Sequence, residues 1–459
     1  MEETDTENPV ENTGYNNAAN QAANPTESTG ANANADTSAN TPANADTTGT
    51  AGANATAVGG LENLNLKALA LIFGGIIIFG VVSFMGIGKI PMWAEYFFSA
   101  SLEVAPFMIL ALGAYLSKKY EGLKIFTTIW LLVIIAGLAF YTLSLGIFAV
   151  LPPEALSEFN AAGQAAMNGG TYTFTNNAAM EEAMKDAIVP ILYLMFGVTL
   201  AGLLSLAAQI RAVRVLLSRY IPIDPDSFVH KTALTAIFAI IFMFCVPLLV
   251  LGEPPLLSAT ALEILKESLM SIQEENIVNV FTLFWMILGS MIVAGLYINK
   301  TPSQVMTRLG LKMPTAKEVA LAIGIAVVLV LVFEVVDHVI GAAFQMLGLH
   351  VTDADKVNIL FAPFMTPVAA ILAAISAGFG EEIAVRGLLQ ERFGILIPTA
   401  FFAMLHALQY NWDGVISVFL TGLIFALLRR HYHTTFSAIT HATYDLILFY
   451  MIIFGITLL

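Results

Sequence analysis

The sequence contains little charge and a single cysteine. Only 12% of its 459 residues are Asp, Glu, Lys or Arg, whereas soluble globular domains carry about 25%. The mean hydropathy of +0.77 is positive, so the chain lacks the polar surface that a soluble protein of this length requires. The one cysteine, Cys245, excludes an intramolecular disulfide and a zinc cluster built on cysteines. These absences predict a polytopic membrane protein.

Basic residues are also scarce, and the formal net charge is -14. Because phosphate recognition needs a concentrated basic face, this balance excludes nucleic acid as a partner. Residues 1–60 contain eight acids and no Lys or Arg, and are otherwise mostly Asn, Ala, Thr and Gly. Such a composition cannot bury enough apolar surface to offset the entropy of ordering. We therefore predict a disordered, acidic, low-complexity tail over 1–60, with docking to a partner as the alternative role.

Apolar runs long enough to cross a bilayer begin at Leu66. A helix needs about 20 apolar residues to span the hydrocarbon core, and no run shows the alternation of a membrane β-barrel strand. The sequence therefore predicts an all-α, polytopic fold with about eleven membrane helices. Their approximate ranges are 66–87, 97–116, 125–150, 188–210, 232–251, 277–298, 319–347, 367–392, 396–410, 414–430 and 435–457.

The distribution of Lys and Arg gives an orientation. With eleven spans, 16 of the 20 basic residues fall on one side of the membrane together with the tail, and Lys89, Lys185, Lys266 and Lys356 fall on the other. Because positive charge accumulates on the cytoplasmic side, we expect a cytoplasmic N-terminal tail and a C-terminus outside a bacterial cell membrane. We divide the membrane part into helices of unassigned role over 61–318 and a second domain over 319–459.

Ionisable residues at membrane depth indicate where function lies, because a charge there costs about 2.5–3.5 kcal/mol on insertion scales. The last third of the chain concentrates such residues on three predicted helices. These are Glu381, Glu382, Arg386, His406, His441 and Asp445.

Helical spacing predicts which of these side chains meet. Glu382 and Arg386 are four residues apart and can form an ion pair, either in support of catalysis or as a structural lock. His441 and Asp445 have the same spacing, and Glu381 points about 100° away from Glu382. Because Glu381 and His406 lie at similar depth, we expect a shared pocket that opens to the cytoplasm.

Two chemistries fit one carboxylate and two imidazoles. Glu381, His406 and His441 form a ligand set suited to catalytic Zn²⁺, with water in the open position. Without metal, Glu381 acts as the general base on a water held by His406, and His441 with Asp445 stabilises the oxyanion. Both alternatives lead to hydrolysis.

The residues resemble the motifs of a known family, the CPBP intramembrane proteases, also called the Abi or type II CAAX prenyl endopeptidase family. Its patterns are EExxxR, FxxxH and HxxxN/D. The first corresponds to Glu381–Arg386, the second to Phe402–His406 and the third to His441–Asp445. The resemblance covers roughly 362–457 and departs from the family at Val385, where Phe is common, and at Asp445, where Asn is commoner.

The resemblance implies a membrane metalloendopeptidase or related hydrolase that cuts membrane-associated peptides, with prenylated proteins among the substrates. It implies that Glu381 and His406 activate water and that His441 with residue 445 binds metal or the oxyanion. A carboxylate at 445 cannot donate a hydrogen bond unless it is protonated, which favours the zinc alternative.

Two other classes of function also suit a polytopic chain with buried acids and histidines. A secondary transporter coupled to protons or cations would place these residues along an ion path. A non-catalytic membrane partner, such as a bacteriocin-immunity-type protein, would use them for binding alone.

Overall fold

The computed structural model describes residues 61–85, 90–173, 178–267 and 272–456, and within these ranges every regular element is a helix. The tail predicted over 1–60 lies outside the described residues. The α-helices are α1 (Leu66–Met85), α2 (Met92–Ser101), α3 (Ala105–Leu116), α4 (Leu123–Val150), α5 (Pro153–Met167), α6 (Ala178–Ser205), α7 (Arg211–Leu217), α8 (Phe228–Leu251), α9 (Ala259–Glu267), α10 (Ile272–Val293), α11 (Pro302–Arg308), α12 (Ala316–Met346), α13 (Ala354–Phe361), α14 (Pro367–Glu381), α15 (Gln390–Phe393), α16 (Leu396–Leu405), α17 (Trp412–His431) and α18 (Thr434–Phe454). The short elements are η1 (Leu61–Asn63), η2 (Leu206–Gln209), η3 (Pro255–Leu257), η4 (Ala362–Phe364), η5 (Glu382–Leu389) and η6 (His406–Leu408).

The prediction of an all-helical, polytopic membrane protein is confirmed, with a slightly smaller number of spans. In the described part of the chain, nine helical segments are long and apolar enough to cross a membrane. A tenth span is formed if α2 and α3, which meet at an angle of 47°, are taken together. The difference from eleven is the segment predicted over 396–410, which is too short to count as a span.

That short segment nevertheless connects the two ends of α8. At one end, a Cβ placed on Gly394 would lie 3.0 Å from the Ile221 side chain, which precedes α8. At the other end, Asn411 Nδ2 donates to the carbonyl oxygen of Gly252, which follows α8, at 3.3 Å. The segment α16–η6 therefore runs from residues beside one end of α8 to residues beside the other end.

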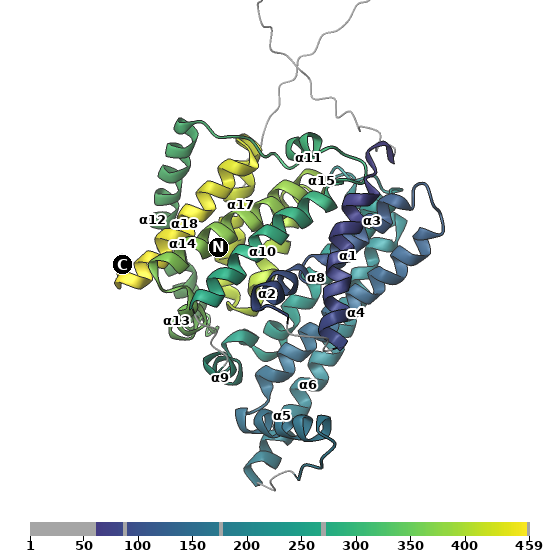
Figure 1. The fold of residues 1–459 in the computed structure, drawn as a ribbon. Coiled ribbons are helices and arrows are strands. Elements are labelled where there is room, and N and C mark those ends of the chain that lie inside the picture. Colours follow the sequence, from purple (N-terminus) through teal and green to yellow (C-terminus); the bar gives the residue numbers. More distant parts are fainter. Residues whose placement is uncertain (1–60, 86–89, 174–177, 268–271, 457–459) are drawn as a thin grey trace, which may run out of the picture. The chain divides into compact units, whose positions relative to one another are not determined.

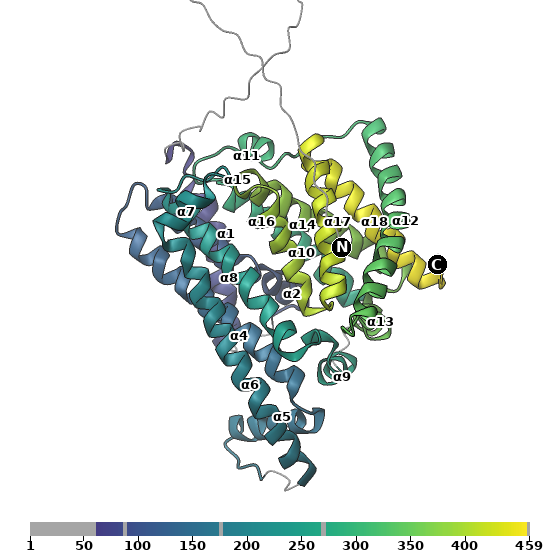
Figure 2. The same cartoon turned by 180° about the vertical axis from the view of Figure 1, so that it is seen from behind.

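The helices form two groups (Figures 1 and 2). Helices α4, α6 and α8 pack around an apolar core that includes Leu194 and Met243. The second group contains α10, α12, α14, α17 and α18, with α14 lying along α18. Helix α16 contacts both α8 and α17, so it joins the two groups.

Local sequence signals set the helix starts that position the site. The Thr366 hydroxyl accepts from the Ala369 backbone N–H, and Pro367 occupies the first turn of α14. The side chain of His433 accepts from the Phe436 N–H and begins α18. Capping groups satisfy backbone donors that have no partner within the helix. Helices α14 and α18 therefore start at defined residues and carry their polar side chains into contact with each other.

Candidate functional site

The predicted acids lie where α14 changes its helical geometry. Helix α14 ends at Glu381, and residues Glu382–Leu389 form a π-helix. At its end the backbone N–H of Gln390 donates to the carbonyl oxygen of Val385, five residues earlier. The sequence predicted one continuous α-helix over 367–392, whereas the structure has a π-helix within this range. Wide turns of this kind occur frequently at functional sites.

Glu382 and Arg386 form the predicted ion pair. Glu382 Oε1 lies 3.1 Å from Arg386 Nη1, and both side chains are fully buried. Arg386 Nη1 has no hydrogen-bond partner by geometry, so its contact with Glu382 is an ion pair without a hydrogen bond. Arg386 Nη2 donates to the Gly422 carbonyl oxygen at 3.0 Å, and the guanidinium carbon lies 4.2 Å from the centre of the Phe402 ring. The pair therefore ties η5 to α16 and α17.

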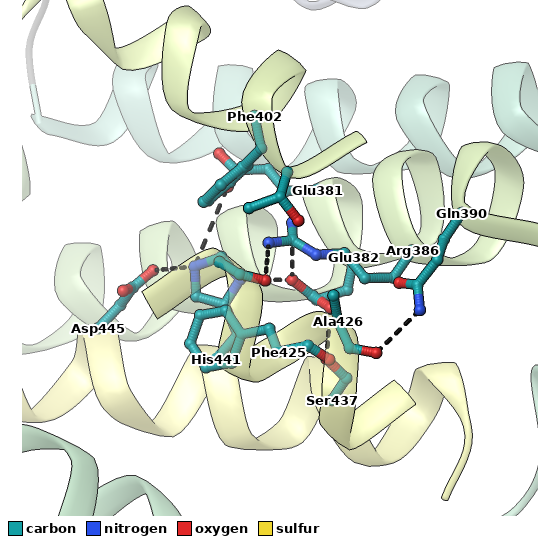
Figure 3. A network of polar contacts seen from close by, with 12 residues as sticks. Glu381, Glu382, Arg386, Gln390, Phe402, Phe425, Ala426, Ser437, His441 and Asp445 are labelled. Carbon is teal, nitrogen blue, oxygen red and sulfur yellow. Dashed lines mark hydrogen bonds and ion pairs between the residues drawn. The ribbon is translucent and has the colours of Figure 1, made fainter. Parts of the chain in front are cut away.

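His441 lies between two carboxylates (Figure 3). Its Nδ1 is 3.2 Å from Glu382 Oε1, and its Nε2 is 3.3 Å from Asp445 Oδ2. The Phe425 ring stacks on the imidazole at 4.5 Å. Ionised carboxylates only accept hydrogen bonds, so both ring nitrogens are placed to donate. His441 therefore acts as a fixed donor, oriented by Glu382 and Asp445.

Glu381 and His406 have free polar atoms. The Glu381 side chain is 28% exposed, and its shortest polar contact among the described residues is 4.0 Å, to His441 Nε2. His406 Nδ1 lies 2.9 Å from the Phe402 carbonyl oxygen, which makes Nδ1 the donor and leaves Nε2 as an acceptor. Electrostatic interaction links Glu381 to His406 and to His441. The structure thus brings together the carboxylate and two imidazoles that the sequence singled out.

The zinc ligand set is not assembled in this arrangement. The donor types of Glu381, His406 and His441 suit Zn²⁺. However, no group of three or more His, Cys, Asp or Glu side chains in the described ranges is placed to hold a metal ion. Because a carboxylate faces each nitrogen of His441, binding zinc would require that ring to leave a partner. The arrangement does not fit the predicted zinc site, and zinc binding stays a prediction.

Two hydrogen bonds lie at the end of the site that was expected to open to the cytoplasm. Thr434, at the start of α18, donates from its hydroxyl to the Leu309 carbonyl oxygen at 2.6 Å and from its N–H to that of Gly310 at 3.0 Å. Exposure instead increases along α18 away from this end, from 6% at the His441 side chain to 21% at Asp445. The opening of the site to the cytoplasm stays a prediction.

A cavity of about 300 Å³ lies at the opposite end of the bundle. Its walls include Gly252, His350 and Asn411, the residue that follows Tyr410. Tyr410 is in turn bonded to the His406 turn, because its N–H donates to the His406 carbonyl oxygen at 2.9 Å. The cavity thus borders Asn411, five residues after His406, and its lining includes neither His406 nor Tyr410.

Several residues that shape the site were not identified from the sequence. The Ser437 hydroxyl donates to Glu382 Oε2 and to the Phe425 carbonyl oxygen. The Tyr410 ring lies parallel to His406 with centroids 6.1 Å apart. Ser437 precedes His441 by four residues, so helical spacing contained a signal for it. Tyr410 follows His406 by four residues across a 3₁₀ turn, where such spacing is less informative.

Helix α14 packs tightly against α18 at Gly378. A Cβ at this position would lie 2.5 Å from the Ala442 nitrogen and 2.7 Å from its Cα. We expect Gly378→Ala to push α18 and its His441 away from Glu382, and to lower any peptide cleavage by at least about 10²-fold because misplacement of catalytic groups is that costly. Gly324→Ala on α12 is the matched control, because nothing lies within 4 Å of its added Cβ. Equal activity of the two variants in detergent would contradict the packing argument.

Residues 363–447 match the family model described as type II CAAX prenyl endopeptidase Rce1-like. The match includes all six predicted site residues, Glu381, Glu382, Arg386, His406, His441 and Asp445. Comparison with curated proteins and with solved structures found no match. The resemblance noted from the motifs is thereby confirmed.

Proposed function

Because residues 363–447 form an Rce1-like domain of the CPBP family of intramembrane proteases, we propose that the chain is an endopeptidase that hydrolyses peptide bonds of membrane-associated substrates. Glu381 with His406 activates the water in this proposal. The substrate class is a peptide or protein held at the bilayer, with prenylated proteins included. The proposed orientation has a cytoplasmic N-terminal tail and the C-terminus outside.

The contrast between the two neighbouring glutamates carries this proposal. Glu382 is fully buried and contacts Arg386, Ser437 and His441. Glu381, one residue earlier, is partly exposed and makes no hydrogen bond with another described residue. A general base needs a free carboxylate with access to water. Of the two carboxylates, only that of Glu381 is partly exposed and free of hydrogen bonds with other described residues.

The proposed reaction uses a water between Glu381 and Nε2 of His406. Glu381 takes one proton from the water while the oxygen of that water bonds to the peptide carbonyl carbon. The resulting oxyanion is stabilised by donors of the site, with His441 as the oriented imidazole. Glu381 then returns the proton to the leaving nitrogen as the C–N bond breaks. The products are a new carboxyl terminus and a new amino terminus, and no other reactant is needed.

The zinc-bound alternative makes a different prediction about metal content. In the metal-free mechanism we expect protein purified without chelator to hold well below one zinc per chain by mass spectrometry of the metal. We also expect cleavage to be insensitive to a chelator. Stoichiometric zinc that is lost in both His406→Ala and His441→Ala would instead support the ligand set Glu381, His406 and His441.

His406 provides the test of the function itself. We expect His406→Ala to lower cleavage of a single-span peptide in liposomes by about 10²- to 10⁴-fold, because the water loses one of its two partners. His338→Ala is the control, since this histidine is exposed on α12 and its Nδ1 lies 3.2 Å from the Glu334 carbonyl oxygen. Cleavage by His406→Ala at the control rate would refute the proposed site.

A further inference from the structure

We propose that Tyr410 is a catalytic residue whose hydroxyl donates a hydrogen bond to the oxyanion formed during hydrolysis. This inference rests on the proposed protease function. It starts from a deficit of donors at the site. Asp445 Oδ2 lies 3.3 Å from His441 Nε2, and an ionised carboxylate cannot donate a hydrogen bond to an oxyanion.

The imidazole donors of the site are shared with acceptors of the protein itself. His441 Nδ1 faces Glu382, and Arg386 lies fully buried behind that carboxylate. His406 Nδ1 is bonded to the Phe402 carbonyl oxygen. The oxyanion of a tetrahedral intermediate next to Glu381 would therefore lie among carboxylates, with too few hydrogen-bond donors to stabilise its negative charge.

Tyr410 lies at this place with a free hydroxyl. Its ring is parallel to the His406 ring, with a 4° angle between the planes and 6.1 Å between centroids. Its hydroxyl interacts electrostatically with both Asp445 and Glu381. Among the described residues, no side chain or carbonyl oxygen forms a hydrogen bond with this hydroxyl. A tyrosine hydroxyl carries its own proton and can donate it in a hydrogen bond.

Two neighbouring tyrosines do not offer the same group. The Tyr450 hydroxyl donates to the Pro367 carbonyl oxygen at 3.4 Å. The Tyr444 side chain is hydrogen-bonded to Thr421. Of the three, Tyr410 is the tyrosine with an unbonded hydroxyl near the carboxylate that activates water.

The fold also holds the Tyr410 ring in place. A Cβ at Gly414 would lie 2.8 Å from Tyr410 Cβ, so α17 starts in direct contact with this residue. On another side the Phe361 ring lies 6.5 Å away between centroids. The Tyr410 N–H is bonded to the His406 carbonyl oxygen at 2.9 Å. A positioned donor of this kind needs no reorganisation when charge develops.

The test compares Tyr410→Phe with Tyr450→Phe and Glu381→Gln in liposomes, using a panel of fluorescence-quenched single-span peptides. The Phe variant keeps the ring beside His406 and removes only the hydroxyl. We expect kcat of Tyr410→Phe to fall by about 10²- to 10³-fold with KM nearly unchanged. Tyr450→Phe should match wild type, and Glu381→Gln should be inactive.

A second measurement separates an oxyanion role from a folding role. A peptide aldehyde, whose hydrate presents tetrahedral oxygens, should inhibit Tyr410→Phe at least about 10²-fold more weakly than wild type, while the matching peptide alcohol should inhibit both equally. Equal weakening of both inhibitors, or an unchanged kcat in Tyr410→Phe beside an inactive Glu381→Gln, would overturn the role of Tyr410 and leave the protease function intact. Cleavage retained by Glu381→Gln would instead overturn the function.

Discussion

Replacing Glu381 by Gln is expected to lower the rate of peptide cleavage by at least about 10³-fold, while the protein stays folded. The amide keeps the size and shape of the carboxylate but cannot take a proton from water. Folding should be unaffected because Glu381 makes no hydrogen bond with another described residue and its nearest polar contact is 4.0 Å away. The measurement is the initial rate of cleavage of a single-span peptide by purified protein in liposomes.

Glu334→Gln is the matched control for this variant. Glu334 also lies on an apolar membrane helix, α12, but outside the matched family region. Its replacement should leave cleavage unchanged and should leave thermal unfolding in detergent unchanged. If Glu381→Gln cleaved at a rate within about threefold of this control, Glu381 could not be the general base.

The largest effect on stability is expected at Arg386. Its replacement by Met keeps much of the apolar stem but leaves the Glu382 carboxylate fully buried without its cation. Breaking a buried ion pair in this way costs about 3–5 kcal/mol of unfolding free energy. The variant also loses the bond to the Gly422 carbonyl oxygen and the contact with Phe402. Reversible unfolding in mixed micelles measures the loss.

An exposed ion pair provides the control for Arg386. Arg211 and Asp226 are 2.8 Å apart, but both side chains are more than 60% exposed. Water screens such a pair, so Arg211→Met should change the unfolding free energy little. Similar stabilities of Arg386→Met and Arg211→Met would show that Glu382 finds another partner or takes up a proton at little cost.

The sequence predicted the parts of this fold that depend on local pattern. Apolar runs predicted all of the long membrane helices, because lipid exposure requires continuous apolar surface. Helical spacing predicted the Glu382–Arg386 and His441–Asp445 contacts, which the structure shows at 3.1 and 3.3 Å. Each of these two contacts joins residues about one helical turn apart.

The features that the sequence did not predict depend on contacts between distant segments. The π-helix at Glu382–Leu389 has no local signature, and Gly387 in it packs against the Leu309 backbone. The hydrogen bond from Thr434 to the Leu309 carbonyl oxygen joins residues 125 positions apart. The zinc prediction considered donor types without knowing that both nitrogens of His441 face carboxylates. Such pairings are decided by tertiary packing.

The central claim, hydrolysis of a membrane peptide by water activated at Glu381, is tested most directly in oxygen-18 water. Wild-type protein in liposomes is incubated with a panel of single-span peptides, and the products are analysed by mass spectrometry. The account predicts cleaved peptides that carry oxygen-18 in the new carboxyl terminus, and no products with Glu381→Gln. Peptides that the wild-type protein binds but leaves intact would contradict the claim and favour a non-catalytic membrane partner. Products formed equally by Glu381→Gln would contradict it as well.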